Sequence, residues 1–382
     1  MNKKVLAGSV IAVILVVTAS WLMLNQFQAA DDASDGTNSY SLHTGINSAL
    51  KEKSYTSQAV IGAIGDVLLH NTVYQDAEEG DSYNFMPMFQ DVETFLKSPD
   101  FMIANQESLP GGAQLGVSSY PAFNSPYEIV DALQQLGVDA VTNANNHSLD
   151  KGAKGVLSAI SHYEEIGMPY TGSFKSKEDR ENIRTFNVNG ISFALLAFTY
   201  GTNGIPVPQG KDYLVNLIDL ELMKKDIKKA KELGVDMVVL AAHWGNEYER
   251  FPNDTQKMLA RELTNAGVDL LIGHHPHVLQ PIEKLTTDDG REAVVIYSLG
   301  NFLSGQEGDL KNIGGIANVT VQKVIDENGK RISFPEIGFQ PTYVTQSDYH
   351  NYRILPLSAA HQSGLVSFAE DEMVSHVMNI KQ

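Results

Sequence analysis

The chain has 382 residues, of which 43% are hydrophobic and 19% charged, which is enough apolar material for a sizeable core and too much for a disordered chain. Its 28 Lys and Arg against 46 Asp and Glu leave a net charge of −18, which argues against nucleic acid as a partner, because nucleic-acid binding depends on clustered cations. The lack of Cys excludes disulfides, thiolate metal ligands, thiol nucleophiles and a lipoprotein anchor.

One apolar segment near the N-terminus, residues 5–24, contains no charge and no proline, and it follows Lys3 and Lys4. It has the roughly 20 residues that cross a bilayer as one helix, and the preceding lysines predict a cytoplasmic N-terminus. We expect residues 1–30 to anchor a single-pass protein in the cell membrane, with its catalytic domain extracytoplasmic. The alternative is a signal peptide that is cleaved near Ala29-Ala30.

The rest of the chain is predicted to form one domain between two less regular segments. Residues 31–57 are rich in Asp, Ser, Asn, Thr and Gly and are expected to be a flexible spacer. Residues 58–346 are expected to fold as the domain. Residues 347–382 show little periodicity apart from a short helix at 369–378 and are expected to be a C-terminal tail.

Within the domain, short apolar runs alternate with amphipathic segments of helical length, which indicates an α/β fold built from βα units. The predicted strands are residues 59–65, 101–105, 140–143, 192–198, 237–242, 270–273 and 293–299. The predicted helices are residues 126–136, 154–166, 220–233 and 255–266. Three of the helices end in Gly-Val-Asp, where a glycine can close the helix before the next strand. Residues 316–324 and 332–343 predict an antiparallel hairpin after the βα units.

Polar side chains recur where the predicted strands end, which is the edge at which open α/β sheets bind ligands. Six of the 11 histidines lie there, together with carboxylates and amides; the full set is Asp66, His70, Glu107, Asn145, Asn146, His147, His243, His274, His275 and His277. Mixed nitrogen and oxygen donors suit Zn, Mn or Fe better than Ca or Mg. We therefore predict a divalent transition-metal site that polarises a phosphoryl oxygen and activates water, with His147 as a general acid.

Each of these residues also has a purely structural explanation. Asp66 and Glu107 can cap turns, His70 can be a surface or supporting group, and His243 can be a hydrogen-bonded core histidine. The pair of imidazoles that flanks Pro276 at the end of an apolar strand is the strongest single indication of a metal. A glycosidase that uses Asp66 and Glu107 stays open, since the carboxylate separation decides it, but it leaves the histidines unexplained.

The order of these motifs resembles the bacterial capsule-synthesis CapA family, whose members are associated with poly-γ-glutamate capsule production. The matching runs lie between residue 58 and about residue 305; they are Gly65-Asp66, Asn105-Gln106-Glu107-Ser108, Ala144-Asn145-Asn146-His147-Ser148-Leu149-Asp150, Ala242-His243-Trp244-Gly245, His275-Pro276-His277-Val278 and Tyr297-Ser298-Leu299-Gly300-Asn301-Phe302. The family is similar to calcineurin-type metallophosphatases. The resemblance therefore implies a four-layer α-β-β-α sandwich with one or two metal ions between its two sheets.

The resemblance also implies roles for individual residues. Asp66 would bind one metal, Glu107 would bridge, and Asn146 would bind the second metal. The shells would be completed by His243, His275 and His277, and the leaving-group acid would be His147. Further candidates are His70, Asn145 and Asn301, whereas His274 matches no ligand position of that family.

The sequence departs from the phosphatase pattern at three positions. The nearest His after Asp66 lies four residues on, at His70, rather than two, the bridging residue is Glu107 rather than Asp, and Asn145 stands where Gly is usual. Two functions therefore stay open. The first is a metal-dependent hydrolase that acts on phosphoester or amide bonds during capsule polymer synthesis or release. The second is a non-catalytic accessory subunit that binds the polymer or supports a membrane synthase through the same pocket.

For either function, the expected partners are the capsule polymer poly-γ-glutamate or its precursor, the membrane synthase subunits, and the lipid bilayer through the N-terminal helix.

Overall fold

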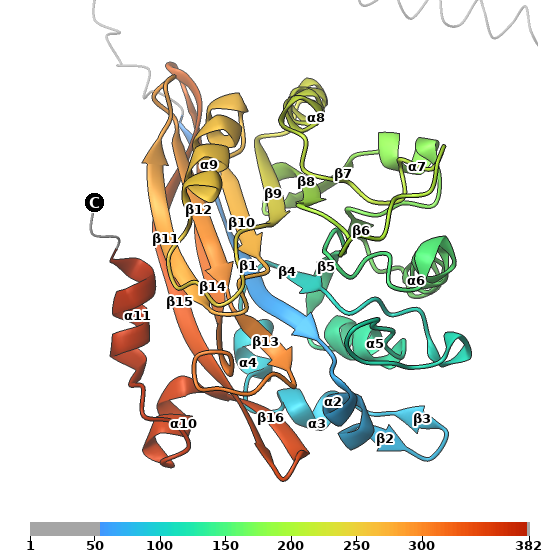
Figure 1. Cartoon of the computed structure of the whole chain (residues 1–382). Helices are drawn as coiled ribbons and strands as arrows, with labels where there is room; N and C mark the ends of the chain where they lie inside the picture. Colours follow the sequence, from blue (N-terminus) through green and yellow to red (C-terminus); the bar gives the residue numbers. More distant parts are fainter. Residues whose placement is uncertain (1–53, 380–382) are drawn as a thin grey trace, which may run out of the picture. The chain divides into compact units, whose positions relative to one another are not determined.

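The computed structural model describes residues 54–379 (Figure 1). The predicted membrane segment at residues 5–24 and most of the predicted spacer lie outside these described residues. No helix within residues 54–379 combines the length and the apolar character that a membrane span requires. The membrane anchor therefore stays a prediction.

Two mixed β-sheets form the centre of the domain. The first has the strand order β16-β15-β14-β1-β4-β5-β6, with β13 paired to the end of β1, and the second has the order β11-β12-β10-β9-β8-β7. The bounds in the first sheet are β1 Tyr55–Leu68, β4 Phe101–Gln106, β5 Val138–Thr142, β6 Tyr170–Thr171, β13 Asn301–Ser304, β14 Ile313–Asp326, β15 Gly329–Ser347 and β16 His350–Pro356. Those in the second are β7 Arg184–Val188, β8 Ile191–Thr199, β9 Met237–His243, β10 Leu270–His274, β11 Leu279–Thr286 and β12 Glu292–Leu299. A small ribbon of β2 (Glu78–Glu79) and β3 (Ser82–Tyr83) stands apart.

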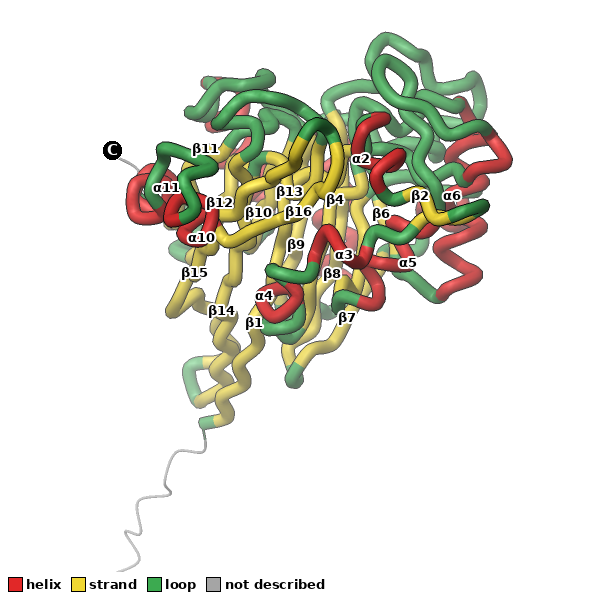
Figure 2. The backbone as a smooth tube through the Cα atoms, turned by 90° about the horizontal axis from the view of Figure 1, so that it is seen from below, coloured by secondary structure: helices red, strands yellow, loops and turns green. Residues whose placement is uncertain are grey.

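The helices are α2 Asn71–Asp76, α3 Met86–Phe89, α4 Glu93–Leu96, α5 Glu128–Gln135, α6 Gly152–Ile166, α7 Lys177–Glu181, α8 Leu220–Glu232, α9 Asp254–Ala266, α10 Leu357–Gln362 and α11 Glu370–Met378. Of these, α5 and α6 cover the outer face of the first sheet and α8 and α9 that of the second, and Figure 2 shows the strands gathered at the centre.

Three apolar clusters separate the layers. The middle cluster joins the facing sides of the sheets, for example Ile61 of β1 and Val239 of β9. The second packs α5 and α6 on the first sheet, and the third packs α8 and α9 on the second. The described residues thus form the predicted four layers, α-β-β-α.

Local sequence explains where the long helices start. Asp219 accepts a hydrogen bond from the backbone N–H of Leu222 at 2.9 Å and caps α8, whose buried residues Met223, Ile227 and Ala230 follow at spacings of four and three. At α9, Asn253 and Gln256 form a reciprocal capping box. Both helices therefore present one apolar stripe to the second sheet.

The repeated Gly-Val-Asp sequence has one structural role at all three positions. Gly137, Gly234 and Gly267 each have a positive φ, of 92°, 78° and 125°. The Asp that follows each glycine by two residues accepts a hydrogen bond from a backbone N–H of the neighbouring strand; the pairs are Asp139 with Met102 (2.7 Å), Asp236 with Ser192 (2.8 Å) and Asp269 with Val238 (2.8 Å). The motif therefore turns the chain and fixes the start of the next strand, and it has no place in the site.

Two of the predicted boundaries differ from the structure. β1 begins at Tyr55 rather than at residue 59, because residues 55–58 pair with β14, so the end of the predicted spacer belongs to the sheet. The predicted tail at 347–382 is also part of the fold: β16 pairs with β15, and α10 and α11 pack their buried residues into the core between the sheets. The strands β6, β7, β11, β13 and β16 escaped prediction because their partners, rather than their own sequence patterns, define them.

Candidate metal centre

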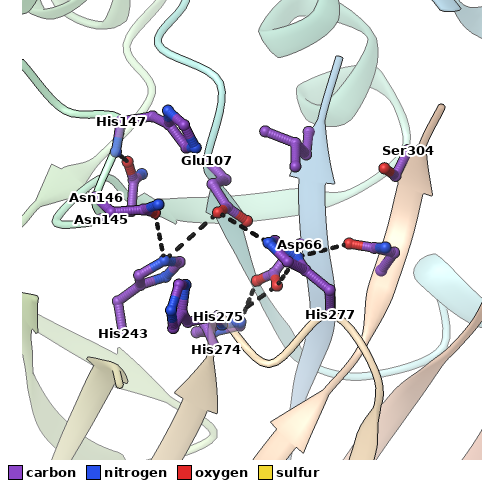
Figure 3. Close-up of polar contacts among 12 residues, drawn as sticks. Asp66, Glu107, Asn145, Asn146, His147, His243, His274, His275, His277 and Ser304 are labelled. Carbon is purple, nitrogen blue, oxygen red and sulfur yellow. Dashed lines mark hydrogen bonds and ion pairs between the residues drawn. The ribbon is translucent and has the colours of Figure 1, made fainter. Parts of the chain in front are cut away.

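The candidate site lies where strands of both sheets end (Figure 3). In the first sheet β1, β4 and β5 are parallel neighbours, and in the second β9 and β10 are parallel neighbours. Their carboxyl ends carry Asp66 in β1, Glu107 after β4, residues 145–147 after β5, His243 at the end of β9, and residues 274–277 after β10. All of these side chains are buried, and Asp66 and Glu107 have no exposed surface.

Two groups of possible metal ligands share one carboxylate. Asp66, Glu107 and His243 form one group, and Glu107, His275 and His277 form the other; within each group the donor atoms lie within 4.8 Å of one another. Oε1 of Glu107 lies 3.4 Å from Nε2 of His243 and 3.7 Å from Nε2 of His277. Glu107 therefore stands between the two groups, which is the position of a bridging ligand. Asp66 and Glu107 are each in contact with imidazoles of this cluster, which a glycosidase carboxylate pair does not require.

Several donor atoms of this cluster are buried without a partner. Neither carboxylate oxygen of Glu107 has a hydrogen bond, and Nδ1 of His243 and Nδ1 of His275 also lack one. Leaving buried polar atoms unpaired is costly, and such atoms in a folded protein call for an explanation. A divalent cation would supply the missing partner, and a set of imidazoles and carboxylates suits a transition metal. The residues present therefore fit the expected metal.

The electrostatics of the cluster also favour a cation. Burial, together with the nearby Asp66 carboxylate, raises the pKa of Glu107 well above its usual range. Burial alone would lower the pKa of His277, but the Glu107 and Asp66 carboxylates outweigh it and raise this pKa to about 9. At neutral pH His277 therefore carries a proton that compensates the buried carboxylate charge, and a divalent ion would take over that compensation.

Neighbouring polar groups fix the orientation of the candidate ligands. Asn105 Nδ2 donates to Asp66 Oδ1 at 2.8 Å, and Nδ1 of His274 lies 3.0 Å from the same oxygen. Nδ1 of His277 lies 3.0 Å from Oδ1 of Asn301. His274, which has no ligand position in the family pattern, is thus a partner of Asp66, and Asn301 is a partner of His277.

The loop after β5 brings the predicted acid to the cluster. Oδ1 of Asn146 lies 2.8 Å from Nε2 of His243. Asn145 points elsewhere: its Nδ2 donates to the Gln106 carbonyl at 3.0 Å, and its Oδ1 accepts from the His147 N–H at 2.9 Å, so it braces the loop. His147 Nδ1 lies 2.8 Å from Asp150 Oδ2. Sequence reasoning gave Asp150 no role, although Asp150 ends the very run that carried the resemblance.

His70 lies outside both donor groups. Its Nδ1 is 3.3 Å from the Leu68 carbonyl and 3.3 Å from the Gly305 N–H, and it directly precedes α2. Burial lowers its pKa to about 4. In this arrangement His70 holds the end of β1 against the loop after β13 and supports the site from a distance.

Two tyrosines border the centre on the side of the second sheet. The Tyr200 ring lies 4.6 Å from the His275 ring, and the Tyr248 ring lies 6.2 Å from the His277 ring. About half of each tyrosine is exposed. Tyr248, His275 and His277 all have positive φ, of 66°, 96° and 59°, and the Tyr248 N–H donates to the Pro276 carbonyl at 2.7 Å. Left-handed backbone at non-glycine residues gathers at functional sites, and here it surrounds the histidine pair.

Comparison with known proteins places these residues in a recognised family. The family described as "Bacterial capsule synthesis protein PGA_cap" matches residues 60–306. The chain is 32% identical over 253 residues to the capsule biosynthesis protein CapA of Bacillus anthracis, covering 64% of this chain and 59% of that one. It is 30% identical over 262 residues to the PGA biosynthesis protein CapA of Bacillus subtilis (strain 168), covering 67% and 66%. The matched region thus spans about three fifths to two thirds of these relatives.

Solved structures show weaker overall similarity. An NAD nucleotidase from Haemophilus influenzae aligns with a TM-score of 0.47 at 12% identity, covering 84% of this chain and 59% of that one. The calcineurin-like phosphoesterase YfkN from Bacillus subtilis aligns with a TM-score of 0.43 at 15% identity, covering 84% and 96%. Because these scores are below 0.5, the family assignment rests on the sequence matches.

Proposed function

This chain belongs to the bacterial capsule synthesis protein family PGA_cap, and on that premise we propose that it acts in capsule polymer synthesis as a metal-dependent hydrolase. The proposed location is the cell membrane, with residues 1–30 as the anchor and the domain extracytoplasmic. The proposed partners are poly-γ-glutamate or its precursor and the membrane synthase subunits. The name of the Bacillus subtilis relative supports the polymer, the name of the Bacillus anthracis relative supports capsule synthesis, and the apolar run at residues 5–24 supports the anchor.

One observation carries the hydrolase proposal: Glu107 is fully buried, both of its carboxylate oxygens lack a partner, and it belongs to two donor groups at once. Asp66 and His243 would hold one ion with it, and His275 and His277 a second, with Asn146 placed beside His243. When bound, such an ion supplies Lewis-acid polarisation of a phosphoryl or carbonyl oxygen.

His147 would serve as the proton donor to the leaving group. An Asp carboxylate can only accept a hydrogen bond, so the 2.8 Å contact with Asp150 places a proton on Nδ1 of His147. The second ring nitrogen, Nε2, is then free to give and take the catalytic proton. The Phe123 ring, 4.7 Å from the imidazole and edge-on to it, limits how far the His147 ring can turn.

The test is metal content, measured by elemental mass spectrometry on the purified full-length protein after reconstitution with Mn, Zn or Fe. It is compared with a His275→Ala/His277→Ala variant and with a His350→Ala/His361→Ala control, which removes two exposed histidines outside the site. We expect metal in the wild type and the control, and its loss from the folded site variant. Such a result justifies a screen of phosphoester and amide substrates. A wild type that stays metal-free would overturn the hydrolase mechanism and leave the accessory-subunit role.

A further inference from the structure

A second, separate binding surface lies at the edge of the second sheet. A cleft of about 1000 Å³ runs between α9, the strands β11 and β12, and α11. Figure 1 shows α11 alongside β11 at the edge of the sandwich. We propose that this cleft, here named the edge cleft, binds a carboxylate-bearing polymer segment of the poly-γ-glutamate type and holds it next to the metal centre. The inference rests on the proposed function, because that function supplies the polymer.

Cationic side chains gather in the edge cleft although the chain as a whole is strongly acidic. Arg250 comes from the loop after β9, and Lys257 and Arg261, four residues apart, share one face of α9. Within residues 54–379 none of the three has a carboxylate within 4.0 Å, although most other arginines of that part are paired, as Arg180 and Arg353 are. These three cations are therefore available to an outside anion.

The carboxylates that face the same cleft do not cancel this charge. Glu283 accepts a hydrogen bond from the Tyr297 hydroxyl at 2.8 Å, and Glu372 lies on the exposed face of α11. Three cations against two carboxylates leave a local positive excess in a protein of net charge −18. An acidic polymer that the rest of the surface repels would therefore be drawn to this place.

The shape of the cleft suits a chain of carboxylates on short aliphatic stems. Its exposed apolar side chain is Phe251, which is 65% exposed, whereas Pro281 and Tyr297 line the cleft but are buried. Methylene groups can pack on the Phe251 ring while guanidinium groups bind carboxylates in a two-pronged manner. A glutamate polymer offers both features at every repeat.

One loop connects the edge cleft to the metal centre. Tyr248 donates its backbone N–H to the Pro276 carbonyl between the two candidate ligand histidines, and Arg250 and Phe251, two and three residues later, line the cleft. Nε2 of Gln280 fixes this loop by donating to the carbonyls of Glu249 (2.8 Å) and Phe251 (3.1 Å). A polymer held in the cleft is therefore tethered close to the centre, which raises its effective concentration there.

The experiment measures binding of fluorescein-labelled poly-γ-glutamate to the purified full-length protein by fluorescence anisotropy. The test variant is Arg250→Gln/Arg261→Gln, and the control is Lys177→Gln/Lys225→Gln, which removes the same charge from exposed sites on α7 and α8. Loss of charge-assisted hydrogen bonds predicts binding that is weaker by about tenfold or more in the test variant, with little change in the control. Wild-type binding should also weaken steeply with added salt.

Equal binding by the test variant and the wild type would overturn the edge cleft as the polymer site. An α-linked polyglutamate that binds more tightly than the γ-linked polymer would identify an acidic protein segment as the occupant and would equally overturn the proposal. The His275→Ala/His277→Ala variant separates this inference from the proposed function. If that variant loses metal but still binds the polymer, the cleft acts independently of the centre. If the wild type binds metal while Arg250→Gln/Arg261→Gln binds the polymer normally, only the cleft proposal fails.

Discussion

His147 and Asp150 form a buried hydrogen-bonded pair at the border of the metal centre, with 2.8 Å between Nδ1 and Oδ2 and side-chain exposures of 6% and 1%. Asp150 Oδ2 also accepts the Phe123 N–H at 2.7 Å, so the carboxylate is held from two sides. The three-residue spacing puts donor and acceptor in one turn just ahead of α6. Asp150 is therefore a positioning residue, which sets the tautomer of His147 without facing the donor cluster itself.

Asp150→Asn should disturb this tautomer and leave metal binding intact. An amide can donate a hydrogen bond to Nδ1, which favours the tautomer with the proton on Nε2. In that tautomer Nε2 cannot accept the proton that it must take up during turnover. We expect a rate about 100-fold lower on whichever substrate the screen identifies, with unchanged metal content. Nitrogen-15 NMR of the histidines reports the tautomer directly.

The surface pair of His162 and Asp131, 2.7 Å apart, offers a matched control for this variant. Asp131→Asn makes the same chemical change far from the centre and should leave the rate and the His147 signal as in the wild type. An Asp150→Asn protein with a normal rate and a normal His147 tautomer would show that Asp150 only stabilises the loop.

Glu107→Gln should abolish stabilisation by metal without harming the metal-free fold. The amide has nearly the same shape and removes a carboxylate whose pKa burial and Asp66 already raise, so we expect the variant in chelator to be at least as stable as the wild type. Metal at 100 times its Kd should stabilise the wild type by about 2.7 kcal/mol and the variant by nearly nothing. Thermal unfolding with and without metal measures both values.

The control for Glu107→Gln is Glu262→Gln, which removes a surface carboxylate paired with Lys224. It should show the same response to metal as the wild type. If metal still stabilises the Glu107→Gln protein, Glu107 is not a ligand that the two donor groups share.

Sequence reasoning reached the elements that carry their own pattern. The buried parallel strands β4, β8, β9 and β10 each contain an apolar run, and the helices α8 and α9 have clear stripes and caps, so both kinds of element were predicted to within one or two residues. β13 and β16 could not be predicted in this way. Each is defined by an adjacent strand, β1 or β15, that lies far away in the sequence or across a turn.

The same distinction holds for the site. The positions of Asp66, Glu107 and His243 at the ends of predicted strands indicated that they would meet, because parallel strands bring their carboxyl ends to one edge. The supporting contacts depend on side-chain direction, which no spacing reveals. His274, the last residue of β10, contacts Asp66, and Asn301, the first residue of β13, contacts His277, which lies in a loop where His275 and His277 both have positive φ.

Asn301→Ala should weaken metal binding although Asn301 lies outside both donor groups. Its Oδ1 lies 3.0 Å from Nδ1 of His277, and its Nδ2 donates to the Lys311 carbonyl at 2.9 Å, so it orients the imidazole. Loss of such a supporting contact typically lowers metal affinity by about 10- to 100-fold. Competition with a fluorescent chelator gives the Kd. Asn318→Ala, in β14 on the same sheet, should not change it, and an unchanged Kd for Asn301→Ala would show that packing alone orients His277.

Asp236→Asn should destabilise the protein in a pH-dependent way. Burial would raise the Asp236 pKa, but hydrogen bonds from Lys323 (2.8 Å), Ser192 and Lys330 (2.9 Å) outweigh it and lower the pKa well below 3.8. The ionised carboxylate therefore contributes stability above the unfolded-state pKa, and this stability is lost as pH falls below about 4. We expect a cost of about 2 kcal/mol at pH 7.

Urea unfolding at several pH values tests this cost. The difference between the wild type and Asp236→Asn should shrink progressively as pH falls from about 5, because the unfolded wild type then takes up a proton that the folded protein, with its lowered Asp236 pKa, does not. Asp81→Asn, which changes an exposed carboxylate, serves as the control and should show no such trend. A difference that stays constant with pH would mean that geometry rather than charge makes Asp236 important.

Gly65→Ala should damage both the fold and the centre, because the glycine before Asp66 permits a close approach of two backbones. A Cβ at residue 65 would lie 2.2 Å from the Gly300 carbonyl oxygen, which is the atom that accepts the Asp66 N–H at 2.8 Å. Relief of the clash must move β1 away from the Gly300 turn, and Asp66 moves with it. We expect a loss of roughly 1–3 kcal/mol in the free energy of unfolding, together with weaker metal binding.

Gly201→Ala is the matched control: an added Cβ there meets no atom within 4 Å and the backbone φ is ordinary, so its stability should stay within about 0.5 kcal/mol of the wild type. If Gly65→Ala were as stable as Gly201→Ala and bound metal normally, the close contact with Gly300 would not require a glycine at residue 65.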